Sequence, residues 1–291
     1  MPSEPAAALY VVSTPIGNLG DVTRRAEEVL RGADVVLAED TRRTSILLRH
    51  LGISTRLVSA HEHNEQARAG LVVQMLREGQ RVALVSDAGT PLLSDPGARI
   101  VREVVDAGVP VVPVPGASAL LAALVASGIS AERFTFHGFP PRKGAERRAL
   151  LEEVAALPHA SVLYESPNRV GKLLADLAEA AGADRRVCVA RELTKLHEEF
   201  FRGTLAEAVA RFGDEDVLGE IVVVVEGRPA DEAREAETDE MAGRALAKAL
   251  IDQGLSPSNA AKELRRRLGL ARNEAYRLAQ EAAGEDGDEG E

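Results

Sequence analysis

Short apolar runs alternate with stretches of helical periodicity in the first part of the chain. The runs are bounded by Gly, Pro, Asp and Ser, a pattern that predicts buried strands. They lie at 9–12, 35–38, 82–85 and 111–114. Helices are predicted between them at 22–32, 65–78, 98–107 and 118–127. Strands that alternate with helices predict βαβ units and a mainly parallel sheet, so we place a first α/β domain at 1–117.

The same alternation continues with looser spacing after Gly128. Apolar runs predict further strands at 133–136, 160–164, 187–190 and 220–225. Helical stretches at 146–156 and 169–181 lie between them. We therefore expect a second α/β domain at 118–228.

The C-terminal part has a different composition. Residues 229–241 are acidic and almost without large apolar groups, which predicts a solvated linker. Ser256 before Pro257 fits a helix N-cap with proline at the first helical position. Three helices with glycine turns and basic residues predict a helix-turn-helix-like module at 242–283, with a small docking bundle as the alternative. The helices are expected at 242–253, 257–268 and 271–282, and a disordered acidic tail at 284–291.

Charge and cysteine content narrow the functional classes. The net charge of -11 comes almost wholly from 231–240 and 285–291, whereas 244–280 carries eight bases and three acids. A polyanionic partner therefore remains compatible with the sequence. Cys188 is the single cysteine, so no disulfide can form within the chain. No apolar stretch approaches the roughly 20 residues of a membrane span, and no signal peptide is evident, so we expect a cytoplasmic protein.

Three predicted strands break directly into loops rich in glycine, proline and serine. The loops are 13–20, 86–97 and 115–118, and parallel strands would bring them to one sheet edge. Such loops bind ligands through main-chain groups. No Rossmann or Walker glycine motif is present. His61 and His63 have the residue type of zinc ligands, but no cysteine pair or further histidine cluster accompanies them, so we expect no metal site.

Six motifs in order carry a resemblance over nearly the whole chain. They are STPIGNLGD (13–21), AEDTR (38–42), SDAGTPLLSDPG (86–97), PGAS (115–118), YESPNR (164–169) and RELTKLHE (191–198). Together they resemble the tetrapyrrole methylase superfamily and, within it, the small-subunit ribosomal RNA (cytidine-2'-O-)-methyltransferases.

The resemblance implies two α/β domains with a cofactor cleft between them, a small C-terminal helical module and a homodimer. The implied cofactor is S-adenosyl-L-methionine. The implied reaction is methylation of the ribose 2'-hydroxyl of a cytidine in the decoding region of 16S ribosomal RNA. Because the basic excess is modest and confined to 244–280 in a chain with a net charge of -11, we expect the substrate to be the assembled small subunit, whose shape is already in place.

The loops supply the cofactor-binding candidates. Asp87 either contacts the cationic cofactor or shapes its own turn, and we favour the contact because Ala88 and Gly89 permit close approach. Asp95, before Pro96, is expected to cap a turn or helix. The full set of cofactor candidates is Pro15, Ile16, Gly17, Asp87, Ala88, Gly89, Thr90, Ser118, Ala119 and Tyr164.

Charged residues after strand ends supply the catalytic and RNA-binding candidates. Methyl transfer needs an in-line acceptor oxygen and removal of its proton, but the sequence does not assign the base. Salt bridges at the strand ends are the alternative interpretation of these charges. The catalytic candidates are Glu39, Asp40, Glu165 and Lys195. The RNA-binding candidates are Arg42, Arg43, Arg142, Lys143, Asn168, Arg169 and Arg266.

Two other functions remain compatible with these patterns. One is a methylase of another acceptor, such as a tetrapyrrole carbon or a protein side chain, on the same scaffold. The other is a regulator that senses a small ligand and binds DNA through 242–282. The basic pairs Arg42-Arg43 and Arg142-Lys143 favour a polyanionic substrate over a porphyrin-like one.

Overall fold

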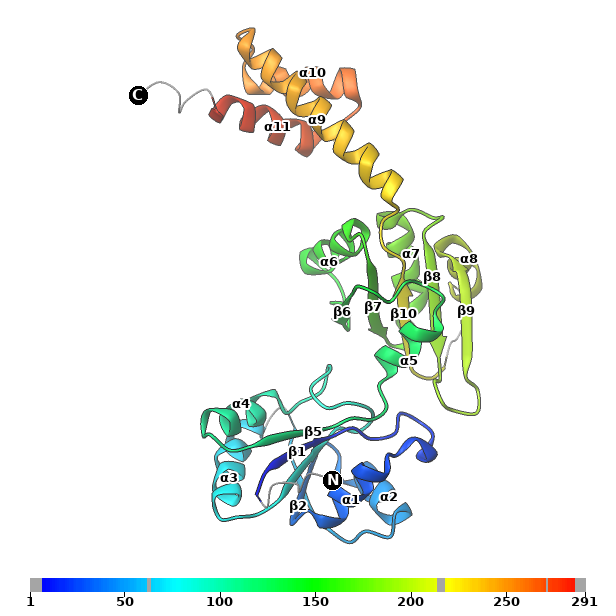
Figure 1. Cartoon of the computed structure of the whole chain (residues 1–291). Coiled ribbons are helices and arrows are strands. Elements are labelled where there is room, and N and C mark those ends of the chain that lie inside the picture. The colour runs from blue at the N-terminus through cyan, green and yellow to red at the C-terminus, as the bar shows by residue number, and fades with distance from the viewer. Residues whose placement is uncertain (1–6, 62–63, 214–217, 271, 286–291) are drawn as a thin grey trace. The chain divides into compact units, whose positions relative to one another are not determined.

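The computed structural model describes residues 7–61, 64–213, 218–270 and 272–285, with the backbone alone for 230–239 and 285. The chain divides into two compact units, 1–227 and 228–291. Within the described residues, the first unit holds two five-stranded sheets (Figure 1). The two sheets correspond to the two predicted α/β halves. The boundary at 117/118 between those halves stays a proposal, because both sheets belong to one compact unit.

The first sheet is parallel throughout, in the order β3-β2-β4-β1-β5. Tyr10 in the central strand pairs with Ala83 on one side and Val112 on the other. The strands are β1 (Leu9–Val12), β2 (Val35–Ala38), β3 (Arg56–Ser59), β4 (Val82–Val85) and β5 (Val111–Val114). Four of them have the predicted bounds. The pattern missed β3, a four-residue edge strand without a buried residue.

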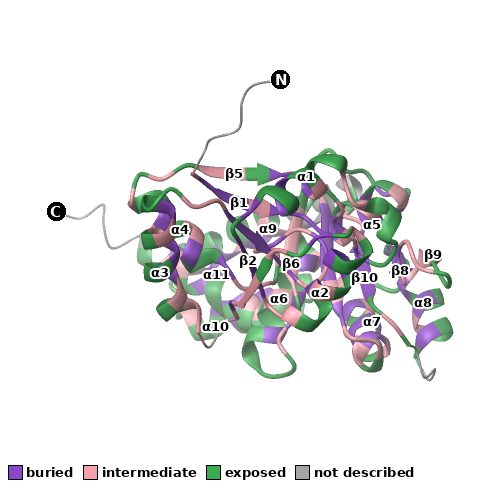
Figure 2. Ribbon diagram, turned by 90° about the horizontal axis from the view of Figure 1, so that it is seen from below, coloured by how far each residue is buried: buried purple, intermediate pink, exposed green. Residues whose placement is uncertain are grey.

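Helices cover both faces of this sheet because side chains alternate along each strand. Tyr10 and Val36 pack on α1 (Arg24–Gly32) and α2 (Thr41–His50). Leu9 and Leu37 pack on α3 (Glu65–Arg77) and α4 (Ala98–Asp106). Figure 2 shows the resulting burial of β1 and β2. Helices were predicted close to α1, α3 and α4, but α2 was not predicted.

The second sheet is mixed, in the order β6-β7-β10-β8-β9. Only β6 and β7 pair in parallel, and the other neighbours are antiparallel. The strands are β6 (Phe134–Gly138), β7 (Ala160–Glu165), β8 (Arg186–Arg191), β9 (Glu199–Thr204) and β10 (Ile221–Val225). Its helices are α5 (Ala119–Ala126), α6 (Ala145–Ala156), α7 (Val170–Ala181) and α8 (Leu205–Phe212). Short 3-10 helices occur at η1 (Leu19–Asp21) and η2 (Pro167–Arg169).

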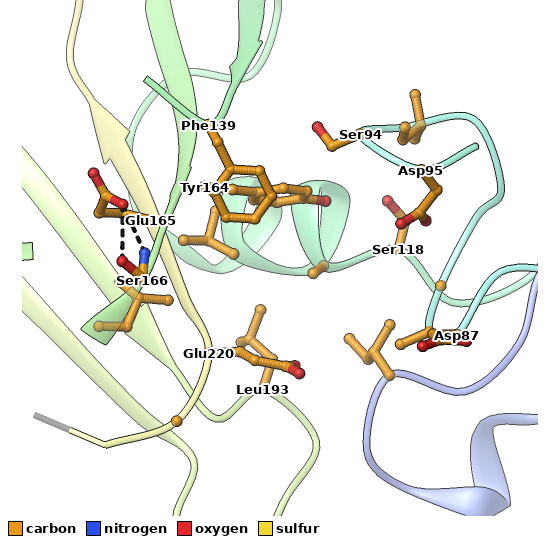
Figure 3. A pocket seen from close by; sticks show the side chains of 18 of the residues that line it. Asp87, Ser94, Asp95, Ser118, Phe139, Tyr164, Glu165, Ser166, Leu193 and Glu220 are labelled. Carbon is orange, nitrogen blue, oxygen red and sulfur yellow. Dashed lines mark hydrogen bonds between the residues drawn. The ribbon is translucent and has the colours of Figure 1, made fainter. Parts of the chain in front are cut away.

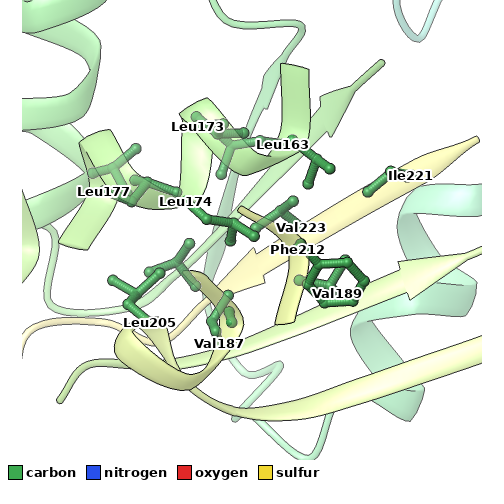
Figure 4. Close-up of a cluster of buried hydrophobic side chains, with 14 of the residues drawn as sticks. Leu163, Leu173, Leu174, Leu177, Val187, Val189, Leu205, Phe212, Ile221 and Val223 are labelled. Carbon is green, nitrogen blue, oxygen red and sulfur yellow. The ribbon is translucent and has the colours of Figure 1, made fainter. Parts of the chain in front are cut away.

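Different segments pack on the two faces of the second sheet. On one face Leu163 and Val223 pack against Leu173 and Leu177 of α7 (Figure 4). The other face packs against α5 and also against Ile16, which belongs to the loop after β1. The loop after β1 therefore contributes to the core of the second sheet.

The C-terminal unit consists of α9 (Ala230–Asp252), α10 (Pro257–Leu268) and α11 (Arg272–Glu285), which share an apolar core. Ser256 is the N-cap of α10 and Pro257 its first residue, as predicted. The predicted linker at 229–241 is wrong in one respect: from Ala230 onward these residues begin α9. An acidic composition with few large apolar groups is compatible with a helix as well as with a linker. The predicted disorder concerns Gly284 and Glu285, which end α11, and 286–291, which lie outside the described residues.

Arginines of this unit are engaged in ion pairs. Glu240 contacts Arg244 at 3.0 Å and Arg277 at 3.5 Å. Arg266, an RNA-binding candidate, pairs with Glu263 at 2.8 Å. Pairing reduces the basic character that the sequence alone indicated. In the described part of the chain, no helix has the length and apolarity to cross a membrane.

Candidate functional site

The three predicted loops converge, as expected from the parallel sheet. The Oγ atoms of Ser13 and Thr90 lie 3.0 Å apart, and the Thr90 hydroxyl donates to the Ala117 carbonyl at 3.1 Å. Thr14 and Gly89 form an isolated β-bridge. The loops are thus held together at one end of the first sheet.

A cavity of about 380 Å³ lies where these loops face the second sheet (Figure 3). Its walls come from the loops after β4 and β5 on one side and from β7, β10 and the loop after β8 on the other. Many predicted site residues line it. They are Ile16, Arg43, Asp87, Ala88, Gly89, Thr90, Ser118, Ala119, Tyr164 and Glu165.

The loop after β4 places Asp95 at the cavity wall, and the backbone of this loop adopts rarely populated φ angles. Leu92 and Ser94 have φ of 76° and 69°, in the left-handed region that disfavours side chains. Gly97 has φ of 123°, and a Cβ there would lie 2.9 Å from Cδ2 of Leu84. Strained backbone of this kind persists where surrounding structure enforces it, and it concentrates at functional sites. Asp95 therefore lies at the cavity, and it is not the N-cap of α4, which is Gly97.

Acidic groups crowd this side of the cavity. Burial, followed by the charges of Glu39 and Asp87, raises the pKa of Asp95 to about 6. Burial and the charge of Asp87 also raise the pKa of Glu39. Asp87 accepts a hydrogen bond from the Asp40 N–H at 2.9 Å, which ties the loop after β4 to the start of α2. Arg43, whose Nε lies 3.7 Å from Oδ2 of Asp87, offsets part of this negative charge.

The N-terminus of α5 faces the same cavity. Ser118 is its N-cap and lines the cavity, and its buried Oγ has no hydrogen-bond partner among the described residues. Tyr164 accepts a hydrogen bond from the Leu120 N–H at 3.2 Å. Phe136 and Phe139 pack against the Tyr164 ring at centroid distances of 4.9 and 5.5 Å. Tyr164 thus binds the first turn of α5 through its hydroxyl and forms part of the apolar wall of the cavity with its ring.

Glu165, a predicted catalytic residue, is held in a buried ion pair. Its carboxylate accepts hydrogen bonds from the Ser166 N–H at 2.7 Å and from the Arg169 guanidinium. The side chain of Glu165 is completely buried. These hydrogen bonds use Oε1 of Glu165 and engage Arg169, an RNA-binding candidate, whereas the buried Oε2 has no hydrogen-bond partner among the described residues. Asn168 lies between them in η2 and is exposed.

Asp40 caps a helix, and this role argues against Asp40 as a general base. It is the N-cap of α2, and its carboxylate accepts hydrogen bonds from the Arg42 backbone N–H and guanidinium. The hydrogen bonds of Arg42 lower the pKa of Asp40 to about 2. So acidic a carboxyl is a weak base at neutral pH. Glu39 fits proton transfer better, because its pKa is raised, but Glu39, like Asp40, is not among the residues that line the cavity.

Lys195, the remaining catalytic candidate, is held as a cation. Its Nζ lies 2.7 Å from Glu192 and 3.3 Å from Glu220. Burial acts to lower the pKa of Lys195, but the hydrogen bond that Lys195 donates to Glu192 and the charge of Glu220 outweigh it and raise the pKa. Lys195 packs against Gly17 and is not among the residues that line the cavity. A lysine with a raised pKa does not accept a proton at neutral pH.

Several predicted residues lie apart from the main cavity. Pro15 lines a smaller neighbouring cavity, and Gly17 lies under Lys195. Arg142 and Lys143 occupy an exposed loop before α6. The structure also adds lining residues that the sequence did not indicate, because they reach the cavity only through tertiary folding. Among these are Leu93, Ser94, Phe139, Leu193 and Glu220.

No group of three or more His, Cys, Asp or Glu side chains in the described ranges is arranged to hold a metal ion. His61 contacts Asn64, with Nε2 3.1 Å from Nδ2. His63 lies outside the described residues. The described geometry therefore gives no support to a zinc site at His61.

Comparisons with known proteins assign the chain to a family. Residues 8–209 match the model of the Tetrapyrrole (Corrin/Porphyrin) Methylases. The chain belongs to the tetrapyrrole methylase family. Ribosomal RNA small subunit methyltransferase I of Synechocystis is 42% identical over 273 residues, 94% of this chain and 97% of the relative. The methylase fold also appears in uroporphyrin-III-C-methyltransferase from Thermus thermophilus, with a TM-score of 0.56, 22% identity and coverage of 76% and 94% of the two chains.

A second relative matches a smaller share of this chain. The Thermotoga maritima protein named ribosomal RNA small subunit methyltransferase I is 47% identical over 220 residues, which cover 76% of this chain and 98% of that relative. Nearly the whole Thermotoga relative is thus matched by about three quarters of this chain.

The cavity fits the cofactor of this methylase family, S-adenosyl-L-methionine. A sulfonium and an ammonium group need nearby negative charge, which Asp87 and Asp95 provide. The orphaned Ser118 hydroxyl and the adjacent N-terminus of α5 suit polar groups of the cofactor, its carboxylate included. Leu93, Phe139 and Leu193 offer apolar contact. The residues present are therefore compatible with the cofactor.

Proposed function

We propose that this chain transfers a methyl group from S-adenosyl-L-methionine to the ribose 2'-hydroxyl of a cytidine in 16S ribosomal RNA. The similarity to ribosomal RNA small subunit methyltransferase I, which covers 94% of this chain at 42% identity, carries the proposal. The acidic cavity with its orphaned Ser118 hydroxyl supports it. The family model is named for tetrapyrrole methylases, but the relatives at 42% and 47% identity are named for ribosomal RNA, and we therefore favour the RNA acceptor.

The residues of the cavity have distinct tasks in this proposal. When bound, the cofactor supplies an electrophilic methyl group on a cationic sulfur. Asp87 and Asp95 bind and orient that cation, and Ser118 binds a polar group beside the N-terminus of α5. Leu93 and Tyr164 exclude water from the transfer path. Most of the acceleration then comes from holding the acceptor oxygen in line.

Glu39 is our candidate for the proton acceptor. The raised pKa of Glu39 makes its carboxylate a stronger base, and the charge of Asp87 contributes to that rise. Arg43, whose side chain is 62% exposed at the cavity, is placed to contact an RNA phosphate. Arg42 is more exposed but is engaged with Asp40.

We also propose a homodimer that acts on the assembled small subunit in the cytoplasm. Leu121 and Val125 lie four residues apart on α5, and they are 49% and 74% exposed. An apolar helix face of this kind marks a protein interface. Light scattering should give twice the chain mass for the wild type, and Val125→Asp should shift the protein towards the monomer.

The reaction is tested with labelled S-adenosyl-L-methionine and small subunits that lack the modification. We expect labelled 2'-O-methylcytidine when the nucleosides are separated by mass spectrometry, and less than about 1% of that rate with Asp87→Ala. Purified 16S ribosomal RNA without proteins should be a poorer substrate than the subunit. If the cofactor binds but no RNA is labelled, the RNA acceptor is wrong.

A further inference from the structure

A second cavity, of about 140 Å³, adjoins the first. Arg43 and Asp87 line both cavities. The smaller one, here called the Thr44 cavity, lies between the loop after β1 and the first turns of α2. Its volume is several times what one water molecule needs. It therefore has room for a ligand group beside the methyl-transfer site.

The walls of the Thr44 cavity include exposed apolar side chains. Leu19 is 37% exposed and Ile46 is 57% exposed, whereas Leu47 at the inner side is buried. Branched apolar side chains left open to solvent beside a polar rim are typical of a binding surface. The flat face of a nucleobase can bury apolar surface against such side chains.

Thr44 provides a buried hydroxyl without a partner. The residue is 5% exposed and lines the cavity, and its Oγ1 has no hydrogen-bond partner among the described residues. The Thr44 backbone N–H is already bound to the Asp40 carbonyl at 3.1 Å. Leaving a buried hydroxyl unpaired costs free energy, so its presence beside a cavity points to a ligand that pairs with it.

Arg43 stands between the two cavities. Its Nε lies 3.7 Å from Oδ2 of Asp87, longer than a hydrogen bond, and its side chain is 62% exposed. A guanidinium in this place can contact a phosphate while the groups on either side of that phosphate occupy the two cavities. Two groups joined through one phosphate belong to adjacent nucleotides of one strand.

We propose that the Thr44 cavity binds the base of a nucleotide next to the one that is methylated. Leu19 and Ile46 pack on the base, the Thr44 hydroxyl pairs with a polar atom on its edge, and Arg43 contacts the intervening phosphate. The inference rests on the proposed RNA methylation and adds a determinant of sequence selectivity to it.

The test compares the wild type with two variants and a matched control. Thr44→Val removes the hydroxyl and keeps the shape of the side chain, whereas Ile46→Ala removes part of the apolar wall of the Thr44 cavity. Val105→Ala on α4 is the control, because Val105 is also 57% exposed and lies outside both cavities. Methylation is measured on small subunits reconstituted with 16S ribosomal RNA that carries each of the four bases on either side of the target cytidine. Cofactor affinity and Tm are measured in parallel.

We expect the wild type to prefer one base at one flanking position by about tenfold. Thr44→Val should lose that preference with an unchanged or higher Tm, because an unpaired buried hydroxyl is removed. Ile46→Ala should lower kcat/KM about tenfold, and all variants should keep the cofactor affinity. A purely structural role of Thr44 would not alter base preference.

Two results would overturn the inference and leave the proposed function intact. One is an active wild type that is indifferent to both neighbouring bases. The other is an unchanged preference and rate in both Thr44→Val and Ile46→Ala. A wild type that methylates none of the reconstituted subunits would instead refute the proposed function and, with it, the inference.

Discussion

The side chain of Lys195 lies against the backbone of Gly17. A Cβ on Gly17 would overlap Cγ of Lys195 and come within 3.0 Å of Oγ1 of Thr194. The neighbouring Asn18 N–H donates a hydrogen bond to that same Oγ1 at 3.1 Å. The loop after β1 is thereby fixed to the loop after β8, and Ile16 is held at the cavity.

Gly17→Ala should therefore impair cofactor binding. The added methyl group must displace Lys195 or the loop that carries Ile16, so we expect about a tenfold loss of cofactor affinity by calorimetry. Gly70→Ala in α3 is the matched control, because no atom lies within 4 Å of the methyl group it would add. Equal affinities for the two variants would show that contact with Lys195 does not position the loop.

Asp95→Asn should stabilise the free protein at neutral pH and weaken cofactor binding. The folded state raises the pKa of Asp95 from 3.8 to about 6, so the folded protein binds more protons between these values and loses stability as pH rises. After allowance for solvent screening, we expect Asp95→Asn to gain about 1 kcal/mol at pH 7.5 and almost nothing at pH 4. Urea unfolding at both pH values measures the difference.

Wild-type cofactor affinity should fall as pH drops through about 6, because Asp95 becomes protonated. In Asp95→Asn this pH dependence should be absent. A parallel decline in both proteins would assign the dependence to another group.

Glu39→Gln should slow methyl transfer without changing cofactor affinity. The wild-type rate should rise with pH through the raised pKa of Glu39, because only the ionised carboxylate accepts a proton. Single-turnover rates at saturating cofactor should fall by 10²–10⁴-fold, the range typical of loss of a general base. Glu28→Gln, an exposed carboxylate on α1, serves as control. A Glu39→Gln enzyme with the wild-type pH profile would exclude Glu39 as the base.

Asp176→Asn should destabilise the second sheet and its helices. Arg147 is only 7% exposed in its side chain and lies 2.8 Å from Asp176. Burial acts to raise the pKa of Asp176, but hydrogen bonds from Arg147 and Lys172 prevail and lower it. The stabilisation is present above the unfolded pKa near 3.9 and is lost as pH falls below it. We expect a loss of about 1–3 kcal/mol at pH 7 in urea unfolding, shrinking towards pH 3.

Removal of 228–291 should leave the cofactor site intact. The clusters of buried residues around the two sheets contain no residue of the C-terminal unit among those described. Calorimetry should give cofactor affinities within about twofold for full-length and shortened chains. Arg266→Ala in the full chain tests whether the C-terminal unit contributes to RNA binding. We expect Arg266→Ala to lower the methylation of small subunits less than Arg43→Ala does.

The sequence predicted much of the first sheet, and for a clear reason. Strands β1, β2, β4 and β5 are short apolar runs bounded by turn residues, a signal local to the chain. The edge strands β3 and β9 escaped prediction because polar residues such as Arg56 and Arg202 interrupt their apolar pattern.

By itself the sequence determined the α/β class, the loops that carry the site and, through its motifs, the family. These depend on local patterns and on residue identity along the chain. Only the tertiary structure decided how individual side chains act. Asp40 became a helix cap, Glu165 a buried ion-pair partner and Asp95 a cavity carboxyl with a raised pKa. The partners of Asp40 and Glu165 are close in sequence, but which of these pairs form and which carboxyls are buried depends on the folded backbone. The raised pKa of Asp95 depends on burial and on the charge of Glu39, which is distant in sequence and comes near only in the folded protein.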